Sequence, residues 1–162
     1  MLTLTALQSE EPNPTTPQYP MIHQHVFHVL RHLDYIPVIV TTIIGFIFGG
    51  LWYSTPVFGK AWKEETKLTD EQCKGGSARK MILTLLCTLV AATAIDVLII
   101  ERGLDGLVAG AKFGLFLGIG LGAALNIPAA LFECRTCRYK AIVIGHAVLL
   151  CVLMAAILGA WH

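Results

Sequence analysis

Long runs of apolar residues dominate the pattern of this chain. The first covers residues 36–59, and others follow at 81–100, 106–132 and 141–161. A helix rises about 1.5 Å per residue, so about 20 apolar residues cross a hydrocarbon core of about 30 Å. The connections between the last three runs are short, which makes neighbouring helices antiparallel. The pattern therefore predicts an all-α integral membrane bundle of four transmembrane helices.

Aromatic residues and prolines mark where these helices end or bend. Trp52 and Tyr53 have one polar edge and settle at a membrane–water boundary, and Pro56 disfavours helical geometry at Thr55. We therefore expect the first span to end near Trp52. The third span is the longest of the four, so we expect it to tilt or to bend at Pro128.

The first 35 residues have a different pattern. Residues 1–20 are rich in proline and form a tail that is either flexible or bound to a partner. Residues 21–35 have helical periodicity, with apolar side chains on one face and His25, His28 and His32 on the other. Such a helix lies in the membrane interface or against a partner. We therefore divide the chain into a tail, an amphipathic interfacial helix, and a four-transmembrane-helix domain over residues 36–161.

Composition agrees with a membrane protein and excludes one class of partner. Apolar residues make up 55% of the chain, charged residues 14%, and the mean hydropathy is +0.66, which is more apolar than a soluble domain needs. The net charge of +1 argues against nucleic acid as a partner, since such proteins cluster Lys and Arg on an exposed face. Membrane lipids are therefore expected contacts.

The distribution of Lys and Arg predicts how the chain lies across the membrane. These residues gather in segments 55–80 and 133–140 and are scarce before residue 36 and between residues 101 and 105. By the positive-inside rule, loops 55–79 and 133–139 face the cytoplasm or matrix, and both termini face the opposite side. We expect either a mitochondrial inner membrane or a bacterial-type plasma membrane.

Glycines recur at helical spacing in two spans. In the third span they stand at every fourth position, at Gly110, Gly114, Gly118 and Gly122, while Gly45 and Gly49 form a weaker version in the first span. A glycine stripe lets another backbone approach closely, which drives helix association in lipid. The partner is either another helix of the same chain, which we favour, or a second subunit.

Two ionisable residues lie inside the predicted spans. Asp96 is near the end of the second span and Lys112 near the start of the third, so the connecting turn places both at a similar depth. A charge within a membrane is costly unless it is paired. We expect an ion pair that locks this hairpin, with a proton or cation relay as the alternative.

A second polar group is expected in the inward half of the bundle. It comprises Trp52, Tyr53, Asn126, Glu133 and His146. His146 could titrate near neutral pH and hold a ligand, or it could form a buried hydrogen bond with Asn126. This cluster is the candidate ligand site.

Candidate metal ligands are incomplete. His25, His28 and His32 share a helix face without a fourth ligand, and we interpret them as a polar interfacial face. Cys134 and Cys137 have the spacing of half a zinc site or of a redox pair, with Cys73 predicted on the same side. We interpret the five cysteines as reduced thiols and expect no metal and no cofactor. No catalytic motif stands out, so we expect no enzymatic activity.

The end of the first span carries a resemblance to a known family. The run GLWYSTPVFGKAW at residues 50–62 closely resembles the signature G-x-x-W-Y-S-P-x-x-F-G-K-x-W of the family called domain of unknown function 1761, with Thr55 inserted between the serine and the proline. Similar features are the acidic helix start at residues 68–71, the Asp105-Gly106 pair, Asn126 before Leu-Phe-Glu, and the last span with Gly159. The resemblance covers about residues 36–161 and implies a four-helix membrane domain without an established activity.

These observations lead to one functional expectation with two alternatives. We expect a non-enzymatic accessory or structural subunit of a membrane complex, plausibly in an energy-transducing inner membrane, that contacts other subunits or associates with itself. The first alternative is a small transporter or ligand-binding protein with an inward-facing site around Trp52, Asn126 and His146. The second is a metal- or redox-responsive protein built on the cysteines.

Overall fold

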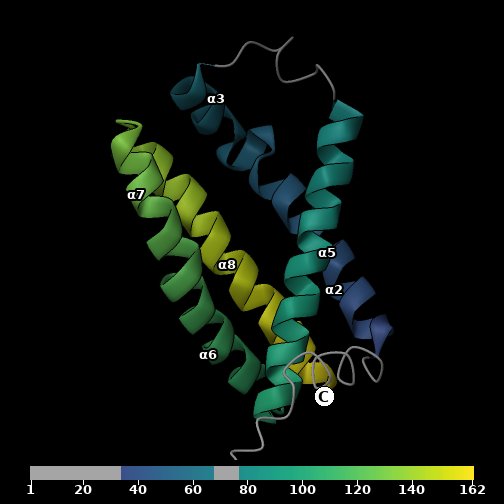
Figure 1. Cartoon of the computed structure of the whole chain (residues 1–162). Helices are drawn as coiled ribbons and strands as arrows, with labels where there is room; N and C mark the ends of the chain where they lie inside the picture. The colour runs from purple at the N-terminus through teal and green to yellow at the C-terminus, as the bar shows by residue number, and fades with distance from the viewer. Residues whose placement is uncertain (1–33, 68–76) are drawn as a thin grey trace, which may run out of the picture. The chain divides into compact units, whose positions relative to one another are not determined.

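The computed structural model describes residues 34–67 and 77–162, and within these ranges the chain is helical and has no strand (Figure 1). The elements in chain order are α2 (Tyr35–Trp52), a π-helical turn (Thr55–Gly59), α3 (Lys60–Thr66), α5 (Ser77–Arg102), α6 (Leu107–Leu117), a second π-helical segment (Gly118–Ala123), α7 (Ala124–Phe132) and α8 (Cys137–Trp161).

Four helical stretches are long and apolar enough to cross a membrane, which confirms the predicted architecture. They cover Tyr35–Thr66, Ala78–Arg102, Leu107–Phe132 and Cys137–Trp161. The proline-rich tail over residues 1–20 lies outside the described residues, so it stays a prediction. The same holds for residues 21–33 of the amphipathic helix expected over residues 21–35, including His25, His28 and His32, whereas Tyr35 begins α2.

The first span ends where the aromatic residues predict. The Asp34 carboxylate caps the start of α2 by accepting a hydrogen bond from the Ile36 amide at 3.2 Å, and the helix stops at Trp52. The chain then turns, and the Gly59 amide donates to the Ser54 carbonyl at 2.8 Å. A Cβ at Gly59 would lie 2.5 Å from the Tyr53 carbonyl oxygen, so this turn requires glycine. It redirects the chain into α3.

The third span is not one regular helix. A π-helical segment separates α6 from α7, and α7 continues through Pro128. The Asn126 side chain donates a hydrogen bond to the Gly122 carbonyl oxygen at 2.6 Å. This bond satisfies a backbone carbonyl of the π-helical segment. The sequence drew attention to Pro128 but gave no signal for the π-helical segment before it.

Helix α8 contacts each of the other three long helical stretches and has its most extensive contact with α6 (Figure 1). The backbones come so close that the Gly106 amide donates to the Gly159 carbonyl oxygen at 2.6 Å. The glycine stripe allows this approach, because a Cβ at Gly114 would lie 2.5 Å from the Cys151 carbonyl oxygen and one at Gly118 would lie 2.9 Å from Val148. These glycines therefore face another helix of the same chain.

Several hydroxyl groups within the spans bond to their own helices, whereas the buried Thr41 hydroxyl has no partner within the described residues. Thr42 donates to the Val38 carbonyl oxygen at 2.7 Å, and Thr93 donates to the Leu89 carbonyl oxygen at 2.9 Å. Such bonds to a carbonyl one turn earlier satisfy a polar side chain where no water is present.

The close approach of α6 and α8 gives a direct test. Replacing Gly114 with alanine places a methyl group against the α8 backbone, so we expect a loss of about 1–3 kcal/mol in the free energy of unfolding. Gly120→Ala is the matched control, because a Cβ there meets nothing within 4 Å. Denaturation with SDS in mixed micelles measures both variants. Equal stability of the two would contradict the packing described here.

Candidate functional site

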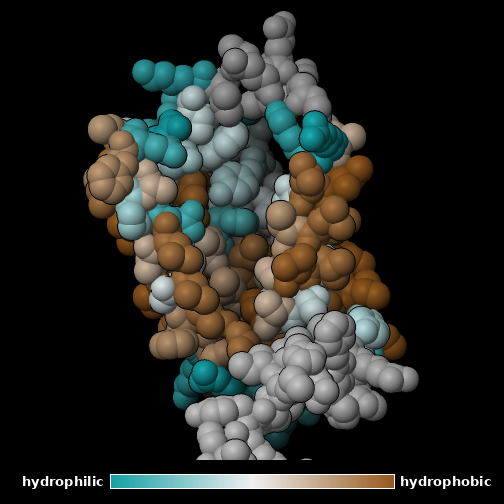
Figure 2. Space-filling view, in the orientation of Figure 1, coloured by the Kyte–Doolittle hydropathy of each residue, from teal (hydrophilic) through white to brown (hydrophobic). Residues whose placement is uncertain are grey.

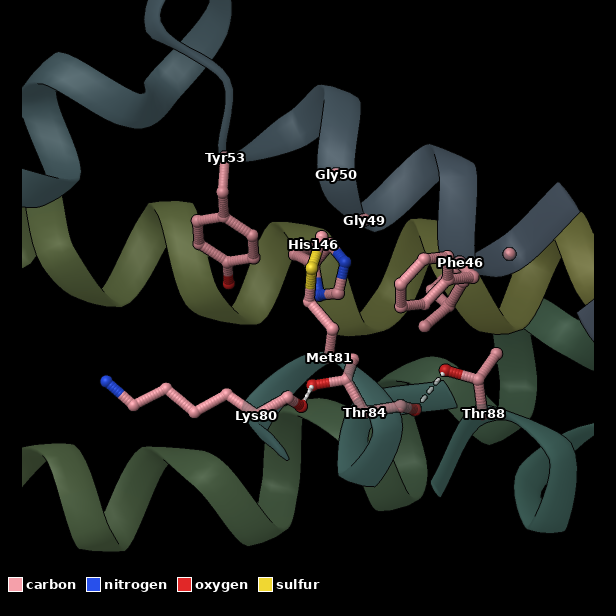
Figure 3. A pocket seen from close by; sticks show the side chains of 11 residues that line it. Phe46, Gly49, Gly50, Tyr53, Lys80, Met81, Thr84, Thr88 and His146 are labelled. Atoms are coloured by element: carbon pink, nitrogen blue, oxygen red, sulfur yellow. Dashed lines mark hydrogen bonds between the residues drawn. The ribbon is translucent and has the colours of Figure 1, made fainter. Parts of the chain in front are cut away.

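A cleft of about 280 Å³ lies between α2, α5 and α8 (Figure 3). Figure 2 shows the described part of the chain hollowed between two hydrophobic surfaces. The surface that faces the cleft is mostly apolar, although its lining residues include a lysine, a tyrosine, a histidine and two threonines besides three apolar side chains and three glycines. The lining residues are Gly45, Phe46, Gly49, Gly50, Tyr53, Lys80, Met81, Thr84, Thr88, His146 and Leu150.

The cleft exists because α5 packs over half of its length. Its buried residues are Thr88, Ala92, Ile95, Asp96 and Ile99, none of them before Thr88, whereas residues 78–87 are exposed. The second half therefore joins the core, and the first half stands away from α2 and α8. The space between them is the cleft.

Glycines shape the wall that α2 contributes. A Cβ at Gly45 would lie 3.2 Å from Thr88 and 3.3 Å from Leu150, so α2 lies close to both neighbouring helices at this level. One turn later, a Cβ at Gly49 would lie 3.4 Å from Nε2 of His146. The missing side chains leave room for the imidazole and for the cleft beside it.

His146 projects from α8 into a group of aromatic rings. Its ring stacks with Phe48 at a centroid distance of 5.8 Å and an interplanar angle of 12°, and it lies 5.0 Å from the Tyr53 ring and 6.1 Å from the Trp52 ring. Trp52 is fixed in turn, because its Nε1 donates to the Ile142 carbonyl oxygen at 3.1 Å. The Nε2 atom of His146 is buried and has no hydrogen-bond partner within the described residues.

The structure brings together three of the five residues expected in the ligand cluster. Trp52, Tyr53 and His146 lie together, with Tyr53 and His146 lining the cleft, but Asn126 is exposed and bonds to its own helix. Glu133 lies in the loop before α8 and pairs with Arg135 at 2.9 Å. The expected hydrogen bond between His146 and Asn126 is therefore absent.

Sequence reasoning missed several residues of the site. Phe48 stands four residues before Trp52, a spacing that puts both rings on one helix face and could have suggested the cluster. Lys80 and the threonines of α5 had no such signal. Their part in the cleft depends on how far α5 stands from α8, which the sequence does not reveal.

A second, polar pocket joins α3 to the start of α8. Glu65 accepts a hydrogen bond from the Thr136 hydroxyl, and Glu64 pairs with Arg138 at 3.0 Å. The hydrogen bond from Arg135 to Glu133 raises the pKa of the guanidinium above its ordinary value. These exposed pairs tie α3 to the last loop, so both lie at the same end of the bundle.

The described cysteines and histidines do not form a metal site. No group of three or more His, Cys, Asp or Glu side chains lies together in residues 34–67 and 77–162. Cys134 and Cys137 are exposed free thiols, and Cys73 lies outside the described residues.

The partner of Asp96 differs from the expected one. Its carboxylate is fully buried and contacts Nε2 of His162 at 2.9 Å, which ties α5 to the end of α8. Lys112 is exposed on α6 and forms no ion pair with Asp96. The expected ion pair between Asp96 and Lys112 does not form, because the part of α5 that carries Asp96 packs on α8 and α2. The buried face of α5 is therefore directed toward the end of α8.

The fold and the cleft define the class: a helical protein with the features of a multi-pass integral membrane protein, carrying an apolar cleft with one buried, unpartnered imidazole nitrogen. The family model described as "Protein of unknown function (DUF1761)" matches residues 36–159. The chain therefore belongs to the DUF1761 family, as its sequence motifs indicated. Comparison with curated proteins and with solved structures gave no match.

A double-mutant cycle tests the partner of Asp96. We expect Asp96→Asn and His162→Ala to couple by about 0.5–3 kcal/mol in the free energy of unfolding, because each removes one side of the same contact. The cycle of Asp96→Asn with Lys112→Ala is the control and should show no coupling. Coupling to Lys112 instead of His162 would restore the original expectation.

Proposed function

We propose that this protein is a non-enzymatic integral membrane protein that binds a small apolar or amphipathic molecule in the cleft between α2, α5 and α8. The observation that carries the proposal is the position of His146, whose side chain lines the cleft and whose buried Nε2 atom has no hydrogen-bond partner within the described residues. A buried polar group without a hydrogen bond costs about 1–3 kcal/mol, which a ligand could recover.

The volume and chemistry of the cleft support binding of a small ligand. Small-molecule sites have volumes of roughly 300–1,000 Å³ and combine apolar walls with a few polar groups. The cleft, at about 280 Å³, is near the lower end of this range. It therefore fits one slender molecule or a single chain better than a whole two-chain lipid.

The same lining argues for binding rather than catalysis. The described residues around the cleft include no carboxylate, and the hydroxyls of Thr84 and Thr88 donate to carbonyls of their own helix at 2.8 Å. His146 therefore has no acidic partner to orient it and no free hydroxyl of these threonines to activate, both of which nucleophilic catalysis needs. In the transporter alternative the same cleft also carries the ligand across the membrane.

The accessory-subunit hypothesis stays a prediction, with one of its arguments weakened. Lateral packing through glycine was expected to hold a neighbouring subunit or another helix of this chain. Gly110, Gly114 and Gly118 are instead covered by α8, so they are not available to a neighbour. That hypothesis now depends on residues 1–35, and native-gel separation of the mild-detergent extract, followed by mass spectrometry, tests it.

Fluorescence quenching tests the proposed binding. In a Trp62→Phe, Trp161→Phe background Trp52 is the remaining tryptophan. A brominated fatty alcohol, a heavy-atom quencher, should reduce its emission in a saturable manner in detergent. Gly49→Leu, which fills the space beside His146, should abolish saturation, whereas Gly120→Leu in open space should not.

Two measurements make this test decisive. A variant that keeps Trp161 instead of Trp52 reports non-specific quenching by probe dissolved in the micelle. Circular dichroism confirms that the Gly49→Leu protein remains helical. Quenching of Trp52 that never saturates, or that Gly49→Leu leaves unchanged, would refute binding in the cleft.

We also propose that loops 55–79 and 133–139 face the cytoplasm or matrix, as the distribution of Lys and Arg indicates. A membrane-impermeant maleimide should then label Cys134, an exposed thiol, from that side. In a background lacking the native cysteines, Asp105→Cys at the other end of the bundle should be labelled from the opposite side. Labelling of both from one side would refute this orientation.

A further inference from the structure

Asp96 is a carboxylate in the interior of a membrane-spanning helix. It lies less than two turns before Arg102, the last residue of α5, and its side chain is fully buried. Every other carboxylate of residues 34–67 and 77–162 is at least partly exposed. An ionisable group at such a position is costly to keep and is by default a candidate for function.

One of the two Asp96 oxygens has a partner and the other has none. Oδ1 lies 2.9 Å from Nε2 of His162, whose side chain is 25% exposed. Oδ2 is buried and has no hydrogen-bond partner within the described residues. An ionised carboxylate accepts hydrogen bonds at both oxygens. This environment therefore leaves one oxygen of the charged form unsatisfied.

The charges around Asp96 give an anion little support. Within the described residues, His162 of α8 and Asp34 at the start of α2 are the charged groups of neighbouring elements that act on Asp96. Asp34 repels a second negative charge. Lys112 of α6 is exposed and forms no ion pair with Asp96, and the Arg102 guanidinium lies over an aromatic ring of α6. An ionised Asp96 therefore depends on His162 alone.

A proton on Asp96 suits this environment better. A neutral carboxyl group donates a hydrogen bond through Oδ1 to Nε2 of a neutral His162, and Oδ2 becomes an uncharged carbonyl oxygen. Burying a neutral polar atom without a partner costs far less than burying an unsatisfied charge. A buried ion pair offsets its desolvation only when its remaining polar atoms are also satisfied. The geometry therefore fits a neutral pair that holds one proton between the two side chains.

We propose that Asp96 and His162 form a proton-binding site, in which Asp96 holds the proton in the folded protein and His162 connects it to the medium. This inference goes beyond the proposed function and does not depend on it. In alkaline medium, hydroxide takes the Nδ1 proton of His162 and becomes water, while the carboxyl proton moves to Nε2. The pair is left with a buried carboxylate, and this charge weakens the packing of α5 on α8.

Infrared spectroscopy of the full chain in detergent tests where the proton lies. At neutral pH we expect the carbonyl stretch of a protonated carboxyl group, which shifts in deuterium oxide and is absent from Asp96→Asn. Asp34→Asn is the matched control and should keep the band, because Asp34 is exposed. A parent protein without such a band overturns the inference, and this outcome does not require that Asp96→Asn fold.

The pH dependence of stability tests whether the folded pair holds the proton. Above about pH 6.5, where an exposed histidine is neutral, the unfolded chain has no proton to lose from either residue, whereas the folded pair has one. Stability therefore falls as the pH rises. The equilibrium constant for unfolding, relative to that of Asp96→Asn, should increase about tenfold per pH unit until the folded pair loses its proton.

Asp34→Asn should keep this pH dependence, because it leaves Asp96 and His162 in place. Equal pH profiles of the parent protein and Asp96→Asn overturn the inference. Saturable quenching of Trp52 by the brominated alcohol reports on the cleft separately, so failure of the proton site and failure of the proposed function are distinguishable.

Discussion

The close approach of two backbones, α6 and α8, is the interaction on which the rest of the bundle depends. The Gly106 amide donates to the Gly159 carbonyl oxygen at 2.6 Å, and beside this bond a Cβ at Gly159 would lie 2.9 Å from the Cα atom of Gly110, so this contact has no room for a side chain at Gly159. In lipid there is no hydrophobic force between helices, so dispersion contacts at this short range supply much of the association energy. With α6 fixed along one side of α8, the opposite side is left for α2 and α5.

The cleft follows from unequal packing along α5. At one end Ile99 and Asp96 are fully buried, and the contact between Asp96 and His162 joins α5 to α8. At the other end the helix has no buried residue over positions 78–87. A helix held at one end and unpacked at the other diverges from its neighbours. The polar contact that replaced the expected pair of Asp96 with Lys112 thus stands at the closed end of the cleft.

The sequence predicted the elements well and the site in part, for physical reasons. Hydropathy predicts the spans because each helix must cross the same thickness of hydrocarbon. Trp52 marked a helix end because its ring prefers the boundary between membrane and water. The partners of Asp96 and Asn126 were wrong because they depend on helix rotation. A π-helical segment changes that rotation by a fraction of a turn without any change in apolar character.

The central position of α8 has a consequence for the biosynthesis of the protein. The ribosome makes α2, α5 and α6 before α8, yet each of these packs against α8. Until translation reaches α8, α2 and α5 can pack only on each other, and α6 lacks its main neighbour. During that interval the glycine face of α6 and the carboxylate of Asp96 are open to whatever assists membrane insertion.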